Sequence, residues 1–170
     1  MQTELRHTVF FQRAIDDVFD FVTTLEHWPR WYPATLRVEC DHGPLRAGAR
    51  AVEHVRKLGL PGVLHWVVTE CERPRRFAME TTAIHMLLFG RAKLRIEYEL
   101  HAESGGTRLT RVWRYELPPP ILPVLDRLYL RRNLIAESDV ALGRLKQLVE
   151  ESAGAPVTSA APSARAQTAS

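Results

Sequence analysis

The sequence has few of the features that mark membrane, exported or nucleotide-binding proteins. No apolar run approaches the roughly 18 residues of a membrane span, and the opening stretch MQTELRHTVFFQRA lacks the apolar segment of a secretory signal. No P-loop, GxGxxG or GxSxG motif occurs. These absences disfavour a membrane protein, a P-loop NTPase, a Rossmann-type dehydrogenase and an α/β-hydrolase. We expect a cytoplasmic protein.

Cysteine and metal-ligand motifs are also scarce. The two cysteines, Cys40 and Cys71, lie far apart and form neither a CxxC pair nor a metal-ligand spacing. Both fall in strand-like segments, where a cysteine is most often a buried free thiol. Since no HxH, HExxH or Cys/His grouping occurs either, we expect no metal site and no cofactor.

What the chain does contain is the composition of a globular protein. Of its 170 residues, 45% are hydrophobic and 25% are charged. A chain of this length and composition can bury a hydrophobic core without disulfide bonds or a structural metal. The net charge of +3 is mild, so no DNA partner is expected. From Ser152 onward the sequence SAGAPVTSAAPSARAQTAS has no aromatic residue. We therefore expect a single domain over residues 1–151 and a disordered tail over 152–170.

The central part of the chain carries a series of strand patterns. Over residues 91–102, apolar side chains alternate with charged or polar ones. This pattern is typical of an antiparallel strand with one solvent-exposed face. Ser104-Gly105-Gly106 follows as a hairpin turn, and its partner strand is 108–117. The other expected strands are 5–12, 36–40, 49–58, 63–72 and 77–83.

Two segments have helical periodicity. The apolar residues of 15–22 recur at helical spacing, and a second short helix is expected to end before Pro29 or Pro33. Over 121–149, apolar residues in steps of three, four and seven predict one long amphipathic helix. About thirty residues would span roughly 45 Å, enough to cross a sheet. The expected fold is α+β: a curved antiparallel sheet of about six to seven strands around a long C-terminal helix, with two short helices after the first strand.

Three stretches and the final helix carry a resemblance to a known superfamily. The stretches are HTVFFQRAIDDVFDFVTTLEHWPRWYP, VTECERPRRFAMET and GGTRLTRVWRYELPPP. Together they cover most of residues 5–150, and the chain resembles the START/SRPBCC (Bet v 1-like) superfamily, in particular its polyketide cyclase/dehydrase-like branch. The resemblance implies a helix-grip fold with a deep cavity between sheet and helix. It leaves the activity open, because this superfamily includes ligand carriers, aromatase/cyclases, receptors and partner-binding proteins.

Three large aromatics fall close together in LEHWPRWYP, namely Trp28, Trp31 and Tyr32. The resemblance implies that aromatics between the first helices and the second strand lie near the mouth of the cavity. Ligand pockets are commonly lined by aromatic side chains, so all three are candidate ligand contacts. The alternative is a satellite core under the short helices.

Arg111 stands out on the strand 108–117. It shares a face with Trp113 and Tyr115, and a guanidinium on such a face needs a partner, because an unpaired buried charge costs several kcal/mol. One interpretation is an anchor for a carboxylate, enolate or phenolate on a ligand. The alternatives are a register slip, or an internal salt bridge to Glu53 or Glu80.

Several further residues are candidates for the cavity wall or for chemistry. Trp66, Met79 and Tyr98 are expected to line the cavity. His54 and His65 flank the turn at 59–62, and if they faced the cavity they could act as acid and base near neutral pH. They could equally point outward, because the sequence does not define the strand register.

Three functions remain open from the sequence. The first is binding of a hydrophobic or aromatic small molecule such as a lipid, isoprenoid or polyketide. The second is a polyketide cyclase, aromatase or dehydratase, which requires convergence in one pocket of His54, His65, Tyr98, Arg111 and Tyr115. The third is docking on a protein or ribosomal RNA through the basic cluster Arg127, Arg131 and Arg132, which could equally be a solvated helix face. The oligomeric state is not indicated.

Overall fold

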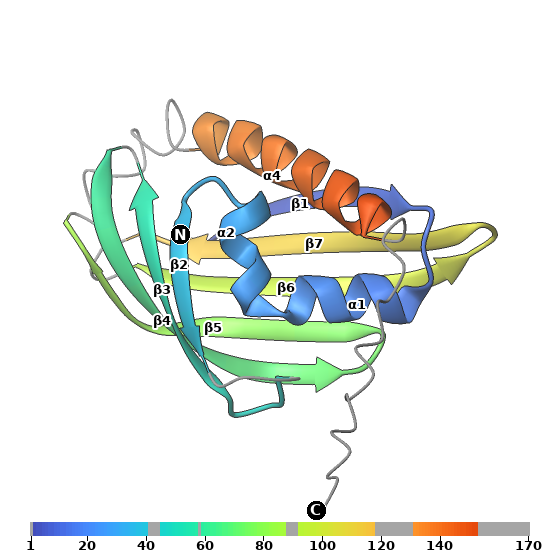
Figure 1. Ribbon diagram of the computed structural model, residues 1–170. Coiled ribbons are helices and arrows are strands. Elements are labelled where there is room, and N and C mark those ends of the chain that lie inside the picture. The colour runs from blue at the N-terminus through green and yellow to red at the C-terminus, as the bar shows by residue number, and fades with distance from the viewer. Residues whose placement is uncertain (1, 41–44, 58, 88–91, 118–130, 153–170) are drawn as a thin grey trace, which may run out of the picture.

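The computed structural model describes residues 2–40, 45–57, 59–87, 92–117 and 131–152. A curved sheet of seven strands wraps around a C-terminal helix, with short helices beside it (Figure 1). The elements are β1 (Gln2–Phe11), α1 (Ile15–Thr23), a 3-10 turn (Leu25–His27), α2 (Trp28–Trp31), β2 (Thr35–Cys40), β3 (Arg50–Lys57), β4 (Leu60–Glu72), β5 (Arg76–Met86), β6 (Lys93–Glu103), β7 (Gly106–Glu116) and α4 (Arg131–Glu151). The predicted α+β class and its helix-grip arrangement are confirmed.

The strand order explains why the short helices lie where they do. The order is β1-β7-β6-β5-β4-β3-β2, and every neighbouring pair is antiparallel. Strands β2 to β7 form a meander, whereas β1 and β2 lie at opposite edges of the sheet. The connection through α1 and α2 must therefore cross the concave face, where Figure 1 shows it beside α4.

The hairpin of β6 and β7 follows the sequence pattern closely. Ile96, Tyr98 and Leu100 are buried, while the intervening residues face outward in ion pairs and solvent. The turn is placed between Glu103 and Gly106, which are cross-strand partners. Gly105 there has a φ of 81°, a conformation that side chains with a Cβ rarely adopt.

Helix α4 closes the concave side of the sheet. Its buried residues recur on one stripe, and they are Leu134, Ser138, Ala141, Leu142, Leu145 and Val149. The expected helix 121–149 is thus observed from Arg131 onward, and its first part lies outside the described residues. Of the expected tail 152–170, only Ser152 is described.

The second short helix ends at Trp31, before Pro33, which is one of the two ends that the sequence offered. Pro29 sits in the first turn of α2, where its missing N–H costs nothing. Leu36, the first apolar residue of the expected strand 36–40, is 53% exposed. The reason is a register irregularity between Thr35 and Arg37, which turns Thr35 into the interior. Cys40 and Cys71 are half-buried rather than buried, and neither forms a disulfide.

Candidate functional site

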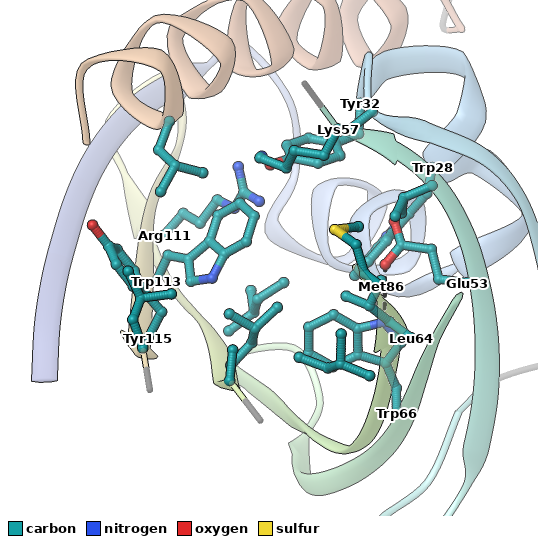
Figure 2. Close-up of a pocket in the computed structure, with 18 of the residues that line it drawn as sticks. Trp28, Tyr32, Glu53, Lys57, Leu64, Trp66, Met86, Arg111, Trp113 and Tyr115 are labelled. Atoms are coloured by element: carbon teal, nitrogen blue, oxygen red, sulfur yellow. Dashed lines mark hydrogen bonds between the residues drawn. The ribbon is translucent and has the colours of Figure 1, made fainter. Parts of the chain in front are cut away.

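A cavity of about 100 Å³ lies between the concave face of the sheet, α2 and α4. Its wall is almost entirely apolar, with three charged side chains among the lining residues. They are Trp28, Trp31, Tyr32, Ala34, Glu53, Val55, Lys57, Leu64, Trp66, Ile84, Met86, Ala92, Leu94, Ile96, Arg111, Trp113, Tyr115, Leu117 and Leu134. In Figure 2, Arg111 and Trp113 lie on one wall, and Glu53 and Trp66 on the opposite one.

All four tryptophans of the chain line this cavity. Trp28 and Trp31 come from one turn of α2, and their ring centroids are 6.0 Å apart in an edge-to-face arrangement. Trp28 also meets Trp66 of β4 edge-on at 6.4 Å. Edge-to-face pairs at this separation are favourable beyond the area that they bury, so these contacts help to fix the position of α2 against the sheet. The aromatic stretch LEHWPRWYP thus contributes directly to the cavity wall.

Arg111 is the most unusual residue of the wall. It is only 2% exposed, and its guanidinium carbon lies 4.9 Å from the ring centroid of Tyr32 and 5.0 Å from that of Trp113. Nε and Nη1 are buried and donate no hydrogen bond within the described structure. Most buried polar groups in proteins do have a partner, so two idle donors on a permanent cation identify a candidate anion site.

Neither internal salt bridge considered for Arg111 is formed among the described residues. Glu80 faces the other side of the sheet, where its carboxylate binds Arg95. Glu53 does face the cavity, but its carboxylate binds Thr35 and Trp66, and no ion pair among the described residues joins it to Arg111. The cation is therefore compensated by aromatic faces and by the more distant charge of Glu53, and such ring contacts offset part of the cost of desolvating it.

Two buried phenols flank Arg111. Tyr32 lies against the guanidinium without reaching hydrogen-bond geometry, and Tyr98 is the cross-strand partner of Arg111 in β6. Burial raises the pKa of both hydroxyls, that of Tyr32 well above its usual value, although the nearby Arg111 charge opposes the shift. Neither hydroxyl has a hydrogen-bond partner in the described chain, and that of Tyr32, which lines the cavity, is available to a ligand as a neutral donor.

Glu53 provides the opposite charge on the facing wall. Its carboxylate accepts hydrogen bonds from Thr35 Oγ1 at 2.5 Å and from Trp66 Nε1 at 2.9 Å. Burial raises the pKa of Glu53, while these two bonds and the charges of Lys57 and Arg111 pull it down. A carboxyl that is held rigidly and titrates above its ordinary range can exchange a proton with a ligand.

Lys57 connects the sheet to the C-terminal helix at the edge of the cavity. Its Nζ lies 2.7 Å from Glu137 Oε2 on α4 and 5.3 Å from the Trp113 ring centroid. Burial lowers the pKa of Lys57, and the Glu137 carboxylate opposes that shift. Because both side chains are about four-fifths buried, at 20% and 19% exposure, this pair is stronger than a surface ion pair.

We expect Glu137→Gln to lower the free energy of unfolding by about 1 to 2 kcal/mol, since the ammonium of Lys57 is largely desolvated and its charge-assisted bond becomes a bond to a neutral amide. Urea denaturation would measure the change. Glu151→Gln removes a carboxylate from the exposed side of the same helix and should cost less than about 0.5 kcal/mol. Equal losses of unfolding free energy in the two variants would show that the ion pair between Lys57 and Glu137 does not stabilise the protein more than a surface carboxylate does.

The other predicted wall residues fall into two groups. Trp66, Trp113 and Tyr115 line the cavity. Met79 and Tyr98 lie on the same concave face but in the packed core beside it, and they are not among the cavity-lining residues. Tyr98 reaches the site only through its neighbour Arg111.

His54 and His65 do not face the cavity, so of the two orientations that the sequence left open the structure has the outward one. On β3 the cavity face carries Glu53 and Val55, which places His54 on the outer side. There His54 Nε2 contacts Glu39 at 3.1 Å, and His65 packs against His85. The odd and even positions of a strand point to opposite faces, and the two histidines take the solvent side.

Lys57 was missed as a cavity residue, and Glu53 was considered only as a salt-bridge partner. Alternation places Ala51, Glu53, Val55 and Lys57 on one face of β3, but the sequence does not indicate that this face is the inner one. Among the described residues, no group of three or more acidic, histidine or cysteine side chains could hold a metal ion. No described helix is long and apolar enough to cross a membrane.

A curved antiparallel sheet that grips a C-terminal helix over an aromatic-lined cavity is the architecture of the START/SRPBCC superfamily. Residues 2–150 match the family described as polyketide cyclase / dehydrase and lipid transport, and the chain belongs to that family. The resemblance found in the sequence is thereby confirmed. At the sequence level no curated protein matches the chain.

Solved structures support the same fold. The Zhui aromatase/cyclase from Streptomyces sp. R1128 superposes with a TM-score of 0.73 at 16% identity, covering 90% of this chain and 96% of that chain. A protein from Thermus thermophilus gives 0.73 at 18% identity, with 90% and 100% covered. A START superfamily protein from Mycobacterium smegmatis gives 0.64 at 18% identity, with 85% and 98% covered. At such identities the likeness establishes the fold alone.

Proposed function

We propose that the protein binds a small aromatic or enolic acid in the cavity, with Arg111 as the anchor of its carboxylate, enolate or phenolate. One observation carries the proposal: Arg111 is buried among aromatic rings with two donors unused. A planar anion would accept both donors and stack against Trp113 and Tyr32. The polyketide-like ligands expected from the family fit this chemistry better than neutral lipids or isoprenoids.

The size of the cavity narrows the ligand further. Its volume of about 100 Å³ is smaller than the several hundred Å³ of typical ligand sites. Such a space takes one ring, so we propose a single-ring ligand or the ring of a larger one. An entire lipid or isoprenoid chain does not fit without displacement of the walls.

Tryptophan fluorescence offers a direct test, because all four tryptophans line the cavity. Benzoate and benzamide have the same shape, but only benzoate carries a charge. We expect benzoate to bind about 10-fold or more tightly than benzamide, because its hydrogen bonds to Arg111 are charge-assisted. Equal affinities would contradict an anion site, and benzamide preferred over benzoate would overturn it.

A second candidate function, a cyclase- or dehydratase-type enzyme, is favoured by Glu53. His54 and His65 do not line the cavity, but the Glu53 carboxyl, whose pKa is raised, faces the same cavity as the Arg111 cation. Together they could remove a proton beside a carbonyl whose oxygen Arg111 stabilises. Levulinate in D₂O tests this: the protein should speed exchange of its α-hydrogens, and Glu53→Gln should remove about 100-fold or more of that acceleration. Exchange at the buffer rate would exclude proton abstraction from this keto acid.

The docking function stays a prediction. Arg131 and Arg132 are exposed at the beginning of α4, and Arg127 lies outside the described residues. No further observation favours this function.

A further inference from the structure

The hydrogen-bonded pairing of strands β5 and β6 stops before either strand ends. Their ladder runs from Arg76 opposite Glu99 to Glu80 opposite Arg95 and stops there, although β5 continues to Met86. Other neighbouring strands, such as β6 and β7, pair along their whole length. Among the described residues, the sheet therefore has a split between two of its central strands, which begins beyond the Glu80 and Arg95 pair.

A bulge in β5 lies at the start of this split. On the β4 side, Trp66 pairs with Thr81 and His65 pairs with Ala83, so Thr82 is an extra residue. An extra residue bends the bulged strand, and here the bend comes directly after the last rung shared with β6. Bulges of this kind are frequent beside binding sites.

The backbone at the start of the split is satisfied by a side chain. The Thr81 hydroxyl accepts a hydrogen bond from the Leu94 N–H at 2.9 Å and contacts the Leu94 carbonyl oxygen at 3.4 Å. A ladder rung is thus replaced by a side-chain contact at this point. Because the N–H of Leu94 keeps a partner, the split can persist in the folded protein without an orphaned donor there.

A second hollow lies over the split. It has a volume of about 480 Å³, several times that of the cavity. Both the cavity and this outer groove are bordered by the same four residues, which are Ile84, Ala92, Leu94 and Tyr115. The two hollows thus adjoin each other, and among the described residues these four line both.

The outer groove differs chemically from the cavity. Its remaining lining residues are Gln2, Glu80, Thr81, Thr82, Ala83, Lys93, Arg95, Arg114 and Glu116. Arg95 and Arg114 are engaged with Glu97, whereas no ion pair among the described residues involves Lys93 or Glu116. The groove thus offers both donors and acceptors to a polar group.

We propose that the outer groove is a second subsite of the same binding site, reached through the split between β5 and β6. It takes a polar chain with hydrogen-bond donors and acceptors, attached to the acidic ring that occupies the cavity. The inference rests on the proposed function and explains how a ligand larger than the cavity is held. Passage requires rotation of Ile84 and Leu94, since Ala92 is already small.

Two matched probes test the subsite. The first probe, 4-acetamidobenzoate, carries the acidic ring with only a short acetamido group. The second probe has N-acetylglycylglycyl in place of the acetyl group, which extends the polar chain. The 3-linked isomers of both compounds serve as a second pair. The longer probe should bind wild type about 10-fold more tightly, the effect of two or so net hydrogen bonds. Ala83→Phe fills the groove from outside the cavity and should abolish this gain without weakening the short probe. His85→Phe, on the exposed side of the same strand, should retain it.

Equal binding of the two probes to wild type, or equal losses of both in Ala83→Phe, would overturn the subsite while the anion site stands. A ligand-free measurement separates the two proposals further. Acrylamide quenching of the four cavity tryptophans should fall in Ala83→Phe and stay unchanged in His85→Phe. Unchanged quenching in Ala83→Phe would overturn the connection. Reduced quenching with neither probe bound would keep the connection but overturn both the ligand class and the proposed function.

Discussion

Replacement of Arg111 by methionine is expected to stabilise the protein while it weakens benzoate binding by about 10- to 100-fold. The guanidinium is buried with two idle donors, so folding bears its desolvation without full compensation. A methionine fills similar space among the rings with no charge to desolvate. Substitution of buried charges by apolar residues often adds about 1 to 4 kcal/mol, and loss of the cation–π contacts subtracts part of this. We expect a net gain of about 1 kcal/mol or more in the free energy of unfolding.

Guanidinium denaturation gives the stability, and tryptophan fluorescence gives the affinity for benzoate. Arg108→Met is the matched control, because it removes the same charge from an exposed position of the same strand. That variant should leave benzoate affinity unchanged. A large loss of stability in Arg111→Met would mean that Arg111 is a structural residue, and the argument for an anion site would fail.

Removal of the Glu53 carboxylate is expected to have the opposite effect on stability. Glu53→Leu leaves the indole N–H of Trp66 and the hydroxyl of Thr35 without their acceptor, and it removes an opposing charge that acts on Arg111. We expect a loss of about 3 kcal/mol in the free energy of unfolding. Glu53→Gln keeps an acceptor for Trp66, and Thr35 can rotate to accept from the amide, so its loss should be about 1 kcal/mol. Similar losses in both variants would show that the hydrogen bonds do not matter.

The difference in stability between wild type and Glu53→Gln should depend on pH because of the pKa of Glu53. Burial raises this pKa above its ordinary 4.5, so the folded protein holds the proton more tightly than the unfolded chain does. The stability that this provides is complete below the unfolded pKa and is lost as the pH rises through the folded pKa. Relative to Glu53→Gln, wild type should therefore lose stability as the pH is raised from about 4 to 8. A relative gain over that range would mean that the pKa is lowered instead.

The fold was predictable because its strongest patterns are local. The alternation in β6 and the Ser104-Gly105-Gly106 turn specify the register of the hairpin, and that register places Arg111 on the concave side. Arg111 could be singled out because it interrupts an otherwise apolar and aromatic face. One hairpin with a well-defined turn thus identified the key residue of the candidate site.

The rest of the site could not be read from the sequence, since β3 has apolar residues on both faces. Val52 lies on the side of His54, whereas Ala51 and Val55 lie on the side of Glu53. The pattern therefore favours neither face, and a shift by one residue exchanges them. The size of the cavity depends on how side chains pack, and the split between β5 and β6 depends on one inserted residue. Neither leaves a periodic signal.

Native mass spectrometry of the protein purified from its own cells, with extraction of the bound molecule, tests the anion site most directly. Wild type and Arg111→Met would be compared side by side. We predict that wild type carries an adduct with an aromatic or enolic acid group, and that Arg111→Met is empty. The same adduct on both proteins, or a neutral molecule in the wild-type cavity, would contradict the assignment of Arg111 as the anchor of an acidic ligand.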